Sequence, residues 1–498
     1  MQCFVAVLRQ IAALLLCAAV LAGCAQVPLR SGPLTECRAL YAAVDRKTDV
    51  SGAADPGLYR VPGFPYLRSS RLLASFRDEV KDDRRFDAWI TALRQADSAA
   101  RDREILVANG RTQWDEKLLD LRQRLQHCGD QLAQADLTTP AARARLRDAV
   151  RVPSDYSFVQ RLFGAYPLTM PFLKIGVDRY QAQAREDFAQ PLQSPASAQM
   201  TLWQAVADPG IVPATPDEVA GWIAAGAQSP LGLPRFSPQQ LQRMFVAYAP
   251  QWWVETQSDD DRLGHPVFDA HDQPTLDTGS AVTYVLQDDA RIDGRVLPQL
   301  VYIVWFAARP ATSALDAYAG HLDGLVWRVT LGSDGRPLVY DTIHPCGCYH
   351  EYFTARPLKR RGDQGFWSES ALIPQGAPVG VTPVAVRIAA GTHFVQRVLP
   401  QREVPQAQGQ SGHYRMLPYV ALLQLPDVAG KPRSLFDAGT GLIAGTERAE
   451  RWWLWISGVR SPGAMRAWGR HAIKFVGEGQ FDDPYLLDHV FDFSAIAP

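Results

Sequence analysis

Apolar residues recur at spacings of three and four through the first half of the chain, with arginine, aspartate, glutamate and glutamine between them. Such a period is typical of helices that bury one face. It predicts helices over 71–80, 85–107 and 114–135. Three more helix starts are marked by a hydroxyl residue followed by proline, because the hydroxyl caps the first turn and proline fits the first helical position. They are Thr139-Pro140, Thr215-Pro216 and Ser237-Pro238.

The pattern changes near Trp252, where short β-rich runs separated by glycine, proline and aspartate replace the long helical segments. The predicted strands are 281–286, 300–306, 325–331, 338–342, 384–388 and 419–425. Gly332-Ser333-Asp334-Gly335 lies between two of them and predicts an antiparallel hairpin. The expected fold class is therefore α+β, with a helical region over 37–250 and a mixed, largely antiparallel β-rich region over 251–498.

The N-terminus has the features of a secretory signal. Arg9 is the only charged residue before an apolar run over 11–21, which is about half the roughly 20 residues needed to span a bilayer. Leu21-Ala22-Gly23-Cys24 then resembles the lipobox of bacterial lipoproteins. This resemblance implies a signal peptide over 1–23, acylation of Cys24 and attachment to a membrane through that lipid. In the same class, Ala25 after the cysteine implies the periplasmic face of the outer membrane.

Residues 24–36, with two prolines and a glycine, predict a short tether between the lipid and the folded chain. The chain beyond the tether is long enough for two or three domains. The 51 lysines and arginines nearly balance the 52 aspartates and glutamates, so the chain lacks the basic field of a nucleic-acid-binding protein. The partners that we expect are the membrane and an envelope protein or cell-wall component, and not nucleic acid.

Four of the seven cysteines remain when Cys3, Cys17 and the lipidated Cys24 are set aside. An even number of cysteines in an oxidising compartment indicates disulfides. Cys37 and Cys128 both lie in helical sequence, and we predict a bridge between them because it leaves the other two cysteines to each other. A pairing of one cysteine from each half of the chain is the alternative.

Residues 344–350, His-Pro-Cys-Gly-Cys-Tyr-His, concentrate the groups able to do chemistry, and we call them the corner. In a regular strand the four histidines and cysteines would project to one face, about 6.6 Å from one to the next. Four groups in a line cannot surround a zinc ion, whose ligands form a tetrahedron at about 2.0–2.3 Å. The strand would have to bend, and Pro345 and Gly347 are placed to allow that.

Three interpretations of the corner stay open. The first is a site for zinc or copper, formed by part of the set His344, Cys346, Cys348 and His350 and completed by His321, Asp323 or His393. The second is a disulfide between Cys346 and Cys348, whose short ring would be strained and would give a rigid turn or a redox pair. In the third, both histidines are ordinary hydrogen-bonding residues of a tight turn.

Other patterns carry less weight. Trp252-Trp253 and Trp452-Trp453-Leu454-Trp455 have the aromatic faces that stack on sugar rings, but such pairs more often straddle a sheet. The three consecutive acids at 259–261 point in different directions, which is typical of a solvated loop rather than a calcium site. Gly439-Thr440-Gly441 predicts a glycine-rich turn.

Two functional hypotheses result. The preferred one is a non-catalytic envelope lipoprotein that binds or scaffolds a partner, because the chain has no intact catalytic pattern; it predicts a broad exposed apolar surface. The alternative is a metal-dependent hydrolase, with His344 and His350 as ligands and Glu351 or Asp323 as the general base acting on a metal-bound water. That hypothesis predicts a concave pocket at the corner. A redox role of the two corner cysteines is a further alternative.

Overall fold

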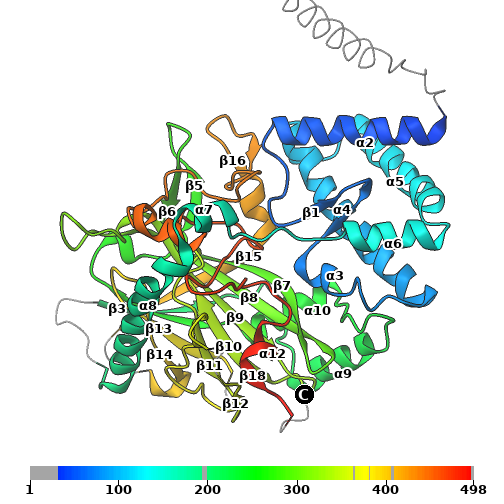
Figure 1. The fold of residues 1–498 in the computed structure, drawn as a ribbon. Coiled ribbons are helices and arrows are strands. Elements are labelled where there is room, and N and C mark those ends of the chain that lie inside the picture. The colour runs from blue at the N-terminus through cyan, green and yellow to red at the C-terminus, as the bar shows by residue number, and fades with distance from the viewer. Residues whose placement is uncertain (1–31, 193–198, 363–364, 381, 405–408, 495–498) are drawn as a thin grey trace, which may run out of the picture.

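The computed structural model describes residues 32–192, 199–362, 365–380, 382–404 and 409–494. The signal, the lipobox with Cys24 and most of the tether lie outside these residues. The first described helix, α2, spans Pro33–Val50, so the last four residues of the expected tether are already helical. The fold class is α+β, as predicted: an N-terminal helical region is followed by a large mixed sheet (Figure 1).

The N-terminal helices pack around a core of their own at one side of the molecule (Figure 1). Trp89, Leu93 and Leu132 are fully buried in this core, which Leu231 and Val296 join from later in the chain. The elements are α2, β1 (Tyr59–Val61), β2 (Phe64–Ser69), α3 (Arg71–Ser75), α4 (Asp83–Ala108), α5 (Glu116–Asp136) and α6 (Pro140–Ala149). The helices predicted over 85–107 and 114–135 are present as α4 and α5, whereas the helix predicted over 71–80 stops after five residues.

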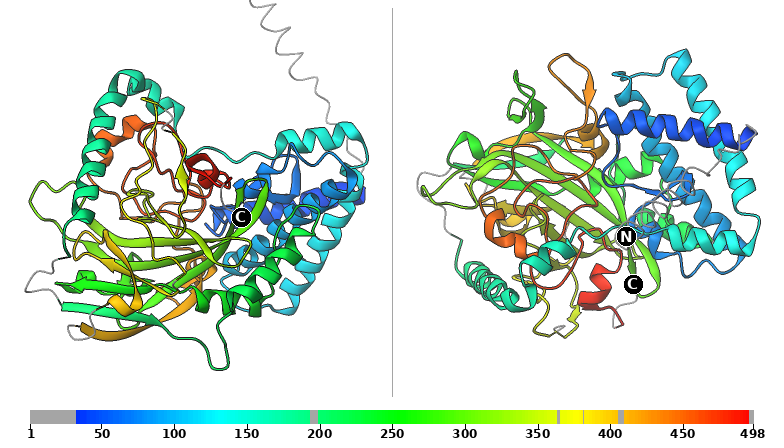
Figure 2. Two further views of the ribbon diagram at one scale, coloured as in Figure 1. Left: turned by 90° about the horizontal axis from the view of Figure 1, so that it is seen from below. Right: turned by 45° about the horizontal axis from the view of Figure 1, so that its top comes forward.

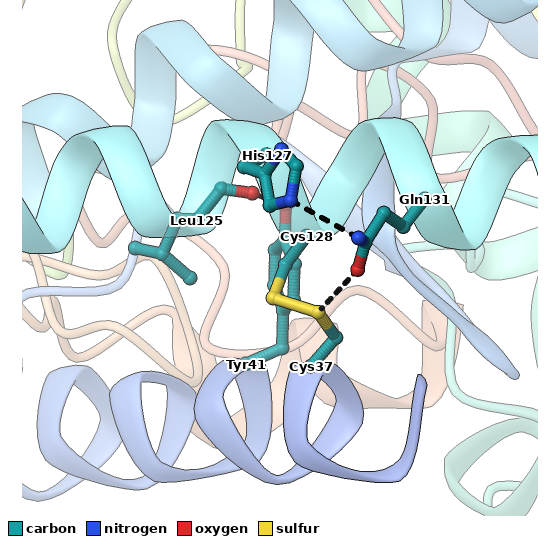
Figure 3. The surroundings of a disulfide bond; sticks show 6 residues. All are labelled: Cys37, Tyr41, Leu125, His127, Cys128 and Gln131. Carbon is teal, nitrogen blue, oxygen red and sulfur yellow. Dashed lines mark hydrogen bonds between the residues drawn. A yellow bond between two sulfur atoms is a disulfide. The ribbon is translucent and has the colours of Figure 1, made fainter. Parts of the chain in front are cut away.

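A disulfide joins α2 to α5 (Figure 3). Its members are Cys37 and Cys128, the two cysteines that the sequence pairs. Beside the bridge, the Tyr41 hydroxyl donates a hydrogen bond of 2.9 Å to the backbone oxygen of Leu125, so the two helices are also joined by a buried polar contact.

Ten strands form the main sheet, in the order β11-β10-β9-β8-β7-β15-β3-β4-β13-β14. Neighbouring pairs are antiparallel except β7–β15, β15–β3 and β4–β13. The strands are β3 (Gln199–Ala205), β4 (Gln251–Thr256), β7 (Val282–Ile292), β8 (Arg295–Arg309), β9 (Gly320–Leu331), β10 (Pro337–Ile343), β11 (Glu351–Thr354), β13 (Val384–Ile388), β14 (Val395–Pro400) and β15 (Gly409–Pro418). Short two-stranded pairs join β5 (His265–Phe268) to β6 (Pro274–Asp277), β12 (Lys359–Arg360) to β18 (Phe491–Asp492) and β16 (Leu425–Pro426) to β17 (Pro432–Arg433).

Both faces of the sheet are buried, as the alternation along β8 illustrates. Tyr302 and Val304 belong to a core shared with α9 (Pro216–Ala227) and α10 (Pro238–Ala247) on one face. Ile303 and Trp305 belong to a core that the C-terminal segments cover on the other face. Since side chains alternate along a strand, a strand that is apolar at every position must be buried on both faces.

Helix α8 (Tyr166–Ala189), which comes after the short α7 (Phe158–Phe163), lies at the end of the molecule opposite the N-terminal helices (Figures 1 and 2). The Tyr180 hydroxyl contacts Glu351 of β11 at 3.4 Å, and Arg397 of β14 donates to the backbone oxygen of Asp187 at 3.3 Å. The helix therefore contacts both outer strands of the sheet, while the backbone at the edge of β11 is paired with Leu372, whose oxygen accepts the Tyr352 N–H at 2.9 Å.

Most predicted strands are present, and the hairpin with Gly335 in its turn joins β9 to β10. Two further predictions were wrong in part. Residues 419–423 form a 3-10 helix, because the chain turns there onto the sheet face and Leu422 and Leu423 are buried. The expected helical region over 37–250 contains β1 and β2, and it also contains β3, which enters the sheet beside β4.

Along the described ranges, with their gaps, we find no helix that is both long and apolar enough to cross a bilayer.

Candidate functional site

A pocket of about 700 Å³ opens at the corner. Its walls come from α8, from the end of β8, from the turn between β10 and β11, and from segments near the C-terminus. Polar and aromatic groups meet there, among them Arg309, Cys348, Tyr349, His350, Phe394 and Glu450. The corner that the sequence singled out is therefore part of a concave site.

The corner is bent rather than extended. The Gly347 N–H donates to the His344 oxygen at 2.8 Å, and the His344 N–H donates to the Cys348 oxygen at 3.0 Å. Gly347 has φ +92°, and a Cβ at this position would lie 2.3 Å from the backbone oxygen of Ala472. No other residue type fits, because a side chain would suffer both an unfavourable φ and a collision with backbone. Tyr349 also has a positive φ, so the strict alternation of a strand is lost.

His344 belongs to a buried network around Asp323 of β9. The two Asp323 oxygens lie 3.1 Å from His344 Nδ1 and 2.9 Å from His393 Nδ1. The Arg448 guanidinium lies 3.4 Å from one of these Asp323 oxygens. Burial raises the pKa of Asp323, but the two histidines and Arg448 hold it well below its usual range. For His344 burial prevails and lowers the pKa, so its ring is neutral at pH 7.

The network continues to Asp261, which lies 3.4 Å from His393 Nε2. The Asp261 carboxylate also accepts backbone N–H groups of Gln257, Ser258 and Gly391. Burial lowers the pKa of His393, but its bonds to Asp261 and Asp323 raise it overall. The interpretation of 259–261 as a solvated loop was wrong for Asp261, because this acid is turned inward onto a histidine and is buried.

His350 has a different partner. Its Nε2 lies 3.0 Å from Asp341, and Arg328 holds the same carboxylate through two hydrogen bonds of 2.9 and 2.6 Å. His344 and His350 therefore turn to separate aspartates. Across the part of the chain that the structure describes, no three histidine, cysteine, aspartate or glutamate side chains are grouped as a metal site would require. His321, considered as a further ligand, contacts the Pro274 oxygen at 2.7 Å instead.

The two corner cysteines are free thiols. Cys346 is buried, and the Cys348 N–H donates to its sulfur at 3.4 Å. Burial raises the pKa of the Cys346 thiol, but the hydrogen bonds from Cys348 and the charge of Arg448 lower it overall. The pKa of Cys348 is raised well above its usual range, first by its hydrogen bond to Cys346 and then by burial. Cys346 is thus the more acidic of the pair.

Glu369 and Glu450 are among the carboxyl groups that line the pocket, and Glu351 is buried behind its wall against Tyr180. Burial raises the pKa of Glu351 to about 8, with Tyr180 as its only opposing contact. Burial also raises the pKa of Glu369 and of Glu450 to about 7 each. At neutral pH Glu351 is therefore mostly uncharged, and it lacks the free carboxylate that a general base needs.

Backbone strain is concentrated near this network. Leu322, Tyr349 and His393 all have φ between 51° and 61°. This left-handed conformation is unfavourable for residues other than glycine, and it persists only where the surroundings impose it. Such outliers gather at binding and catalytic sites, so the backbone adds an independent indication that the corner is functional.

Several groups of the site were missed by sequence reasoning. Arg309, Glu369, Phe394 and Glu450 are single residues in unremarkable sequence, and only the fold brings them to the pocket. The tryptophan pair of β4 is buried on opposite faces of the sheet, Trp252 in one core and Trp253 in another, as such pairs more often are. Trp453 behaves differently, because it is half exposed and lines the pocket.

Comparison of the chain with protein-family models, with curated proteins and with solved structures gives no match.

Proposed function

We propose that this chain is a lipid-anchored protein of the cell envelope that binds a small molecule in the pocket at the corner. The anchor is the lipid on Cys24, which the lipobox implies, and the residue after it favours the periplasmic face of the outer membrane. The body of the protein would then be held at a membrane surface with its binding site in the periplasm.

The observation that carries the proposal is the pocket itself. Its volume of about 700 Å³ lies within the roughly 300–1,000 Å³ typical of sites for small molecules. The walls combine apolar and aromatic residues with a few polar groups, which is the usual composition of such sites. Strained backbone at Tyr349 supports the same conclusion, since a strained turn beside a pocket would fix the side chains that meet the ligand.

Binding is better supported than metal-dependent hydrolysis. His344 and His350 are engaged by different aspartates, and Asp323 is held by two histidines and an arginine. Glu351, the other expected base, is mostly protonated at neutral pH. None of the acids expected to activate a metal-bound water is therefore free to do so.

The proposal is tested by closing the pocket from α8. Gly176 lines the pocket, and a Cβ there would meet nothing within 4 Å, so Gly176→Trp adds bulk without a backbone collision. Gly221 of α9 is the matched control, because it is also a helical glycine in open space but does not line the pocket. The form that begins at Ala25 would be purified from the periplasm and analysed by native mass spectrometry.

We expect a bound small molecule on the wild type and on Gly221→Trp, and at least a tenfold lower occupancy on Gly176→Trp. Equal occupancy on all three proteins would place the ligand elsewhere. A wild-type protein that never carries a molecule, even when purified from cells without washing, would count against the proposed function.

A further inference from the structure

Helix α7 and the first half of α8 present an apolar surface beside the pocket. Phe158, Phe163, Leu168 and Phe172 are between 73% and 79% exposed. With an aromatic side chain covering about 150–250 Å², the three phenylalanines alone present roughly 350–550 Å², as much as the largest apolar patch of a typical monomer. The whole set, which we call the α7–α8 face, is Phe158, Val159, Leu162, Phe163, Leu168, Phe172 and Ile175.

The first half of α8 is apolar on its inner side as well. Met170 and Leu173 are buried against Val476, while Leu168 and Phe172 point away from that core. A helix that is apolar on both sides is normally covered on both. The outer side of α8 is left uncovered by the rest of the described chain, so it requires a partner of low polarity.

The α7–α8 face is continuous with the pocket. Phe172 belongs to both, and Trp453 of α11 (Arg451–Leu454) lines the pocket while 48% exposed. Its neighbour Trp452 is 68% exposed. Tryptophans at such a border are typical of proteins that sit at the boundary of water and lipid, because the ring combines a large apolar area with a polar N–H.

We propose that the α7–α8 face docks on the surface of the bilayer that holds the lipid of Cys24, and that the pocket takes up the acyl chain of an acidic lipid directly from it. This inference rests on the proposed function and names the ligand class of the same pocket. The face supplies the apolar contact with the bilayer, and the aromatic walls of the pocket receive the chain.

Cations and carboxyl groups both line the pocket, Glu369, Glu450 and Asp483 among the latter, and an acidic head group would bind at the cations. Arg309 lies at the wall, and its contacts among the described residues are aromatic. Its guanidinium carbon lies 5.1 Å from the centre of the Phe394 ring and 5.5 Å from that of Tyr318, and one of its nitrogens lies 3.5 Å from the Tyr349 hydroxyl. Lys474 also lines the pocket, with Ser368 Oγ at 3.5 Å; burial lowers its pKa overall, although Glu369 and Asp483 act to raise it. A phosphate or carboxylate would give these cations a charged hydrogen-bond partner.

The bilayer is favoured as the occupant of the face by the length of the tether. Only the eight residues 25–32 separate Cys24 from the start of α2, and a chain of that length spans at most about 29 Å. The N-terminal helices would therefore remain close to the bilayer, and the face at the opposite end of the molecule would reach it when the body lies along the surface. Residues 156–177, which include the whole face, contain Arg161 and Lys174 but no aspartate or glutamate. The two cations are paired with carboxylates outside the segment, Arg161 with Glu478 at 2.7 Å and Lys174 with Asp178 at 2.9 Å, so the face itself is apolar and close to neutral.

The experiment uses the form that begins at Ala25, which lacks the lipid but keeps every described residue. It is floated on a density gradient with vesicles of phosphatidylethanolamine and phosphatidylglycerol, then stripped from them and analysed for bound lipid by mass spectrometry. The face variant is Phe163→Asp with Leu168→Asp. The matched control is Val50→Asp with Leu315→Asp, which replaces exposed apolar residues outside the face.

We expect the wild type and the control to float and to return with phosphatidylglycerol, and the face variant to float at least tenfold less. Gly176→Trp should float like the wild type but return without lipid, because its pocket is closed and its face is intact. Loss of flotation in that variant would contradict the separation of face and pocket.

The inference is overturned if the wild type stays in the aqueous fraction, or if the face variant floats equally well. It is also overturned if the wild type is a dimer that the face variant turns into a monomer, because a second copy would then cover the face. A wild type that carries a small molecule but does not float would contradict this inference and would still agree with the proposed function. A wild type that floats but returns without lipid would overturn the uptake of an acyl chain and leave the proposed function to its own test.

Discussion

Glu351 is the residue of the site with the clearest expected pH dependence. It is buried, its Oε1 contacts the Tyr180 hydroxyl at 3.4 Å, and burial raises its pKa from 4.5 to about 8. The folded state therefore binds more protons than the unfolded state between these pH values, and stability must fall as pH rises through this window. Glu351→Gln, which keeps the shape without the ionisable proton, should remove that fall.

We expect Glu351→Gln and the wild type to be similar in stability near pH 4.5, and the variant to be more stable by roughly 2–5 kcal/mol at pH 8.5. Chemical denaturation midpoints measured from pH 4.5 to 9 would check this. Glu36→Gln is the control, because Glu36 is exposed on α2 and should leave the profile unchanged. Parallel profiles of Glu351→Gln and the wild type would mean that Glu351 is not buried as a neutral acid.

At the residue scale, the corner that the sequence singles out does line a pocket, but the hydrogen-bond partners of its histidines were not predicted. The alternating histidines and cysteines at 344–350 do mark the pocket. A bend at Gly347 was expected of a metal site, but the positive φ of Tyr349 and the engagement of the two histidines by different carboxylates were not predicted. The partner His393 lies 70 residues beyond Asp323 in the chain, and a pairing at that distance leaves no local pattern.

The elements were easier to predict where a local interaction fixes them. Thr215 and Ser237 cap their helices through complete capping boxes, and both starts were predicted correctly from the hydroxyl and proline. β3 was missed, because Gln199–Ala205 is partly exposed and becomes a strand only by pairing with β4 and β15. Tertiary contacts determine whether such segments form strands, and their own sequence does not.

The four cysteines of the described chain lead to a prediction about the N-terminal helices. A thiol count on the form that begins at Ala25, denatured without reductant, should give two thiols, those of Cys346 and Cys348. Reductant should raise the count to four by opening the bridge between α2 and α5. Because the two bridged cysteines are 91 residues apart in the chain, loss of the bridge should destabilise the N-terminal helices by about 4 kcal/mol.

Hydrogen exchange of α2 and α5 with and without reductant would measure that loss. The variant with Cys37→Ser and Cys128→Ser provides the control, since it should start destabilised and show no further change on reduction. A count of no thiols would mean that the corner cysteines are also bonded. Four thiols without reductant would contradict the bridge seen between the two helices.

At the scale of the whole molecule, the site depends on closure of the fold around the sheet. α8 contacts both outer strands, and the corner lies where β10 turns into β11, so residues from distant parts of the chain meet at one pocket. The fold class was predictable from the two periodicities of the sequence. The position of α8 was not, because its apolar residues on two sides give no single direction for packing.

The whole molecule would be attached to the membrane twice, by the lipid of Cys24 and by the α7–α8 face. Two linked attachments reinforce each other, because the first raises the effective concentration of the second by a large factor. Three forms would be compared in cells: the lipidated chain with the face variant Phe163→Asp and Leu168→Asp, the chain whose residues 1–24 are exchanged for a signal cut before Ala25, and the combination of both.

We expect the lipidated face variant to stay in the membrane fraction, since acyl chains alone hold it. The unlipidated chain should divide between the membrane and soluble fractions, and the combination should be soluble. Adding Val50→Asp and Leu315→Asp to the unlipidated chain should change nothing, because these exposed residues lie outside the face. If the unlipidated chain were already fully soluble, the lipid would be the only attachment to the membrane. The pocket would then have to bind its ligand from solution rather than from the bilayer.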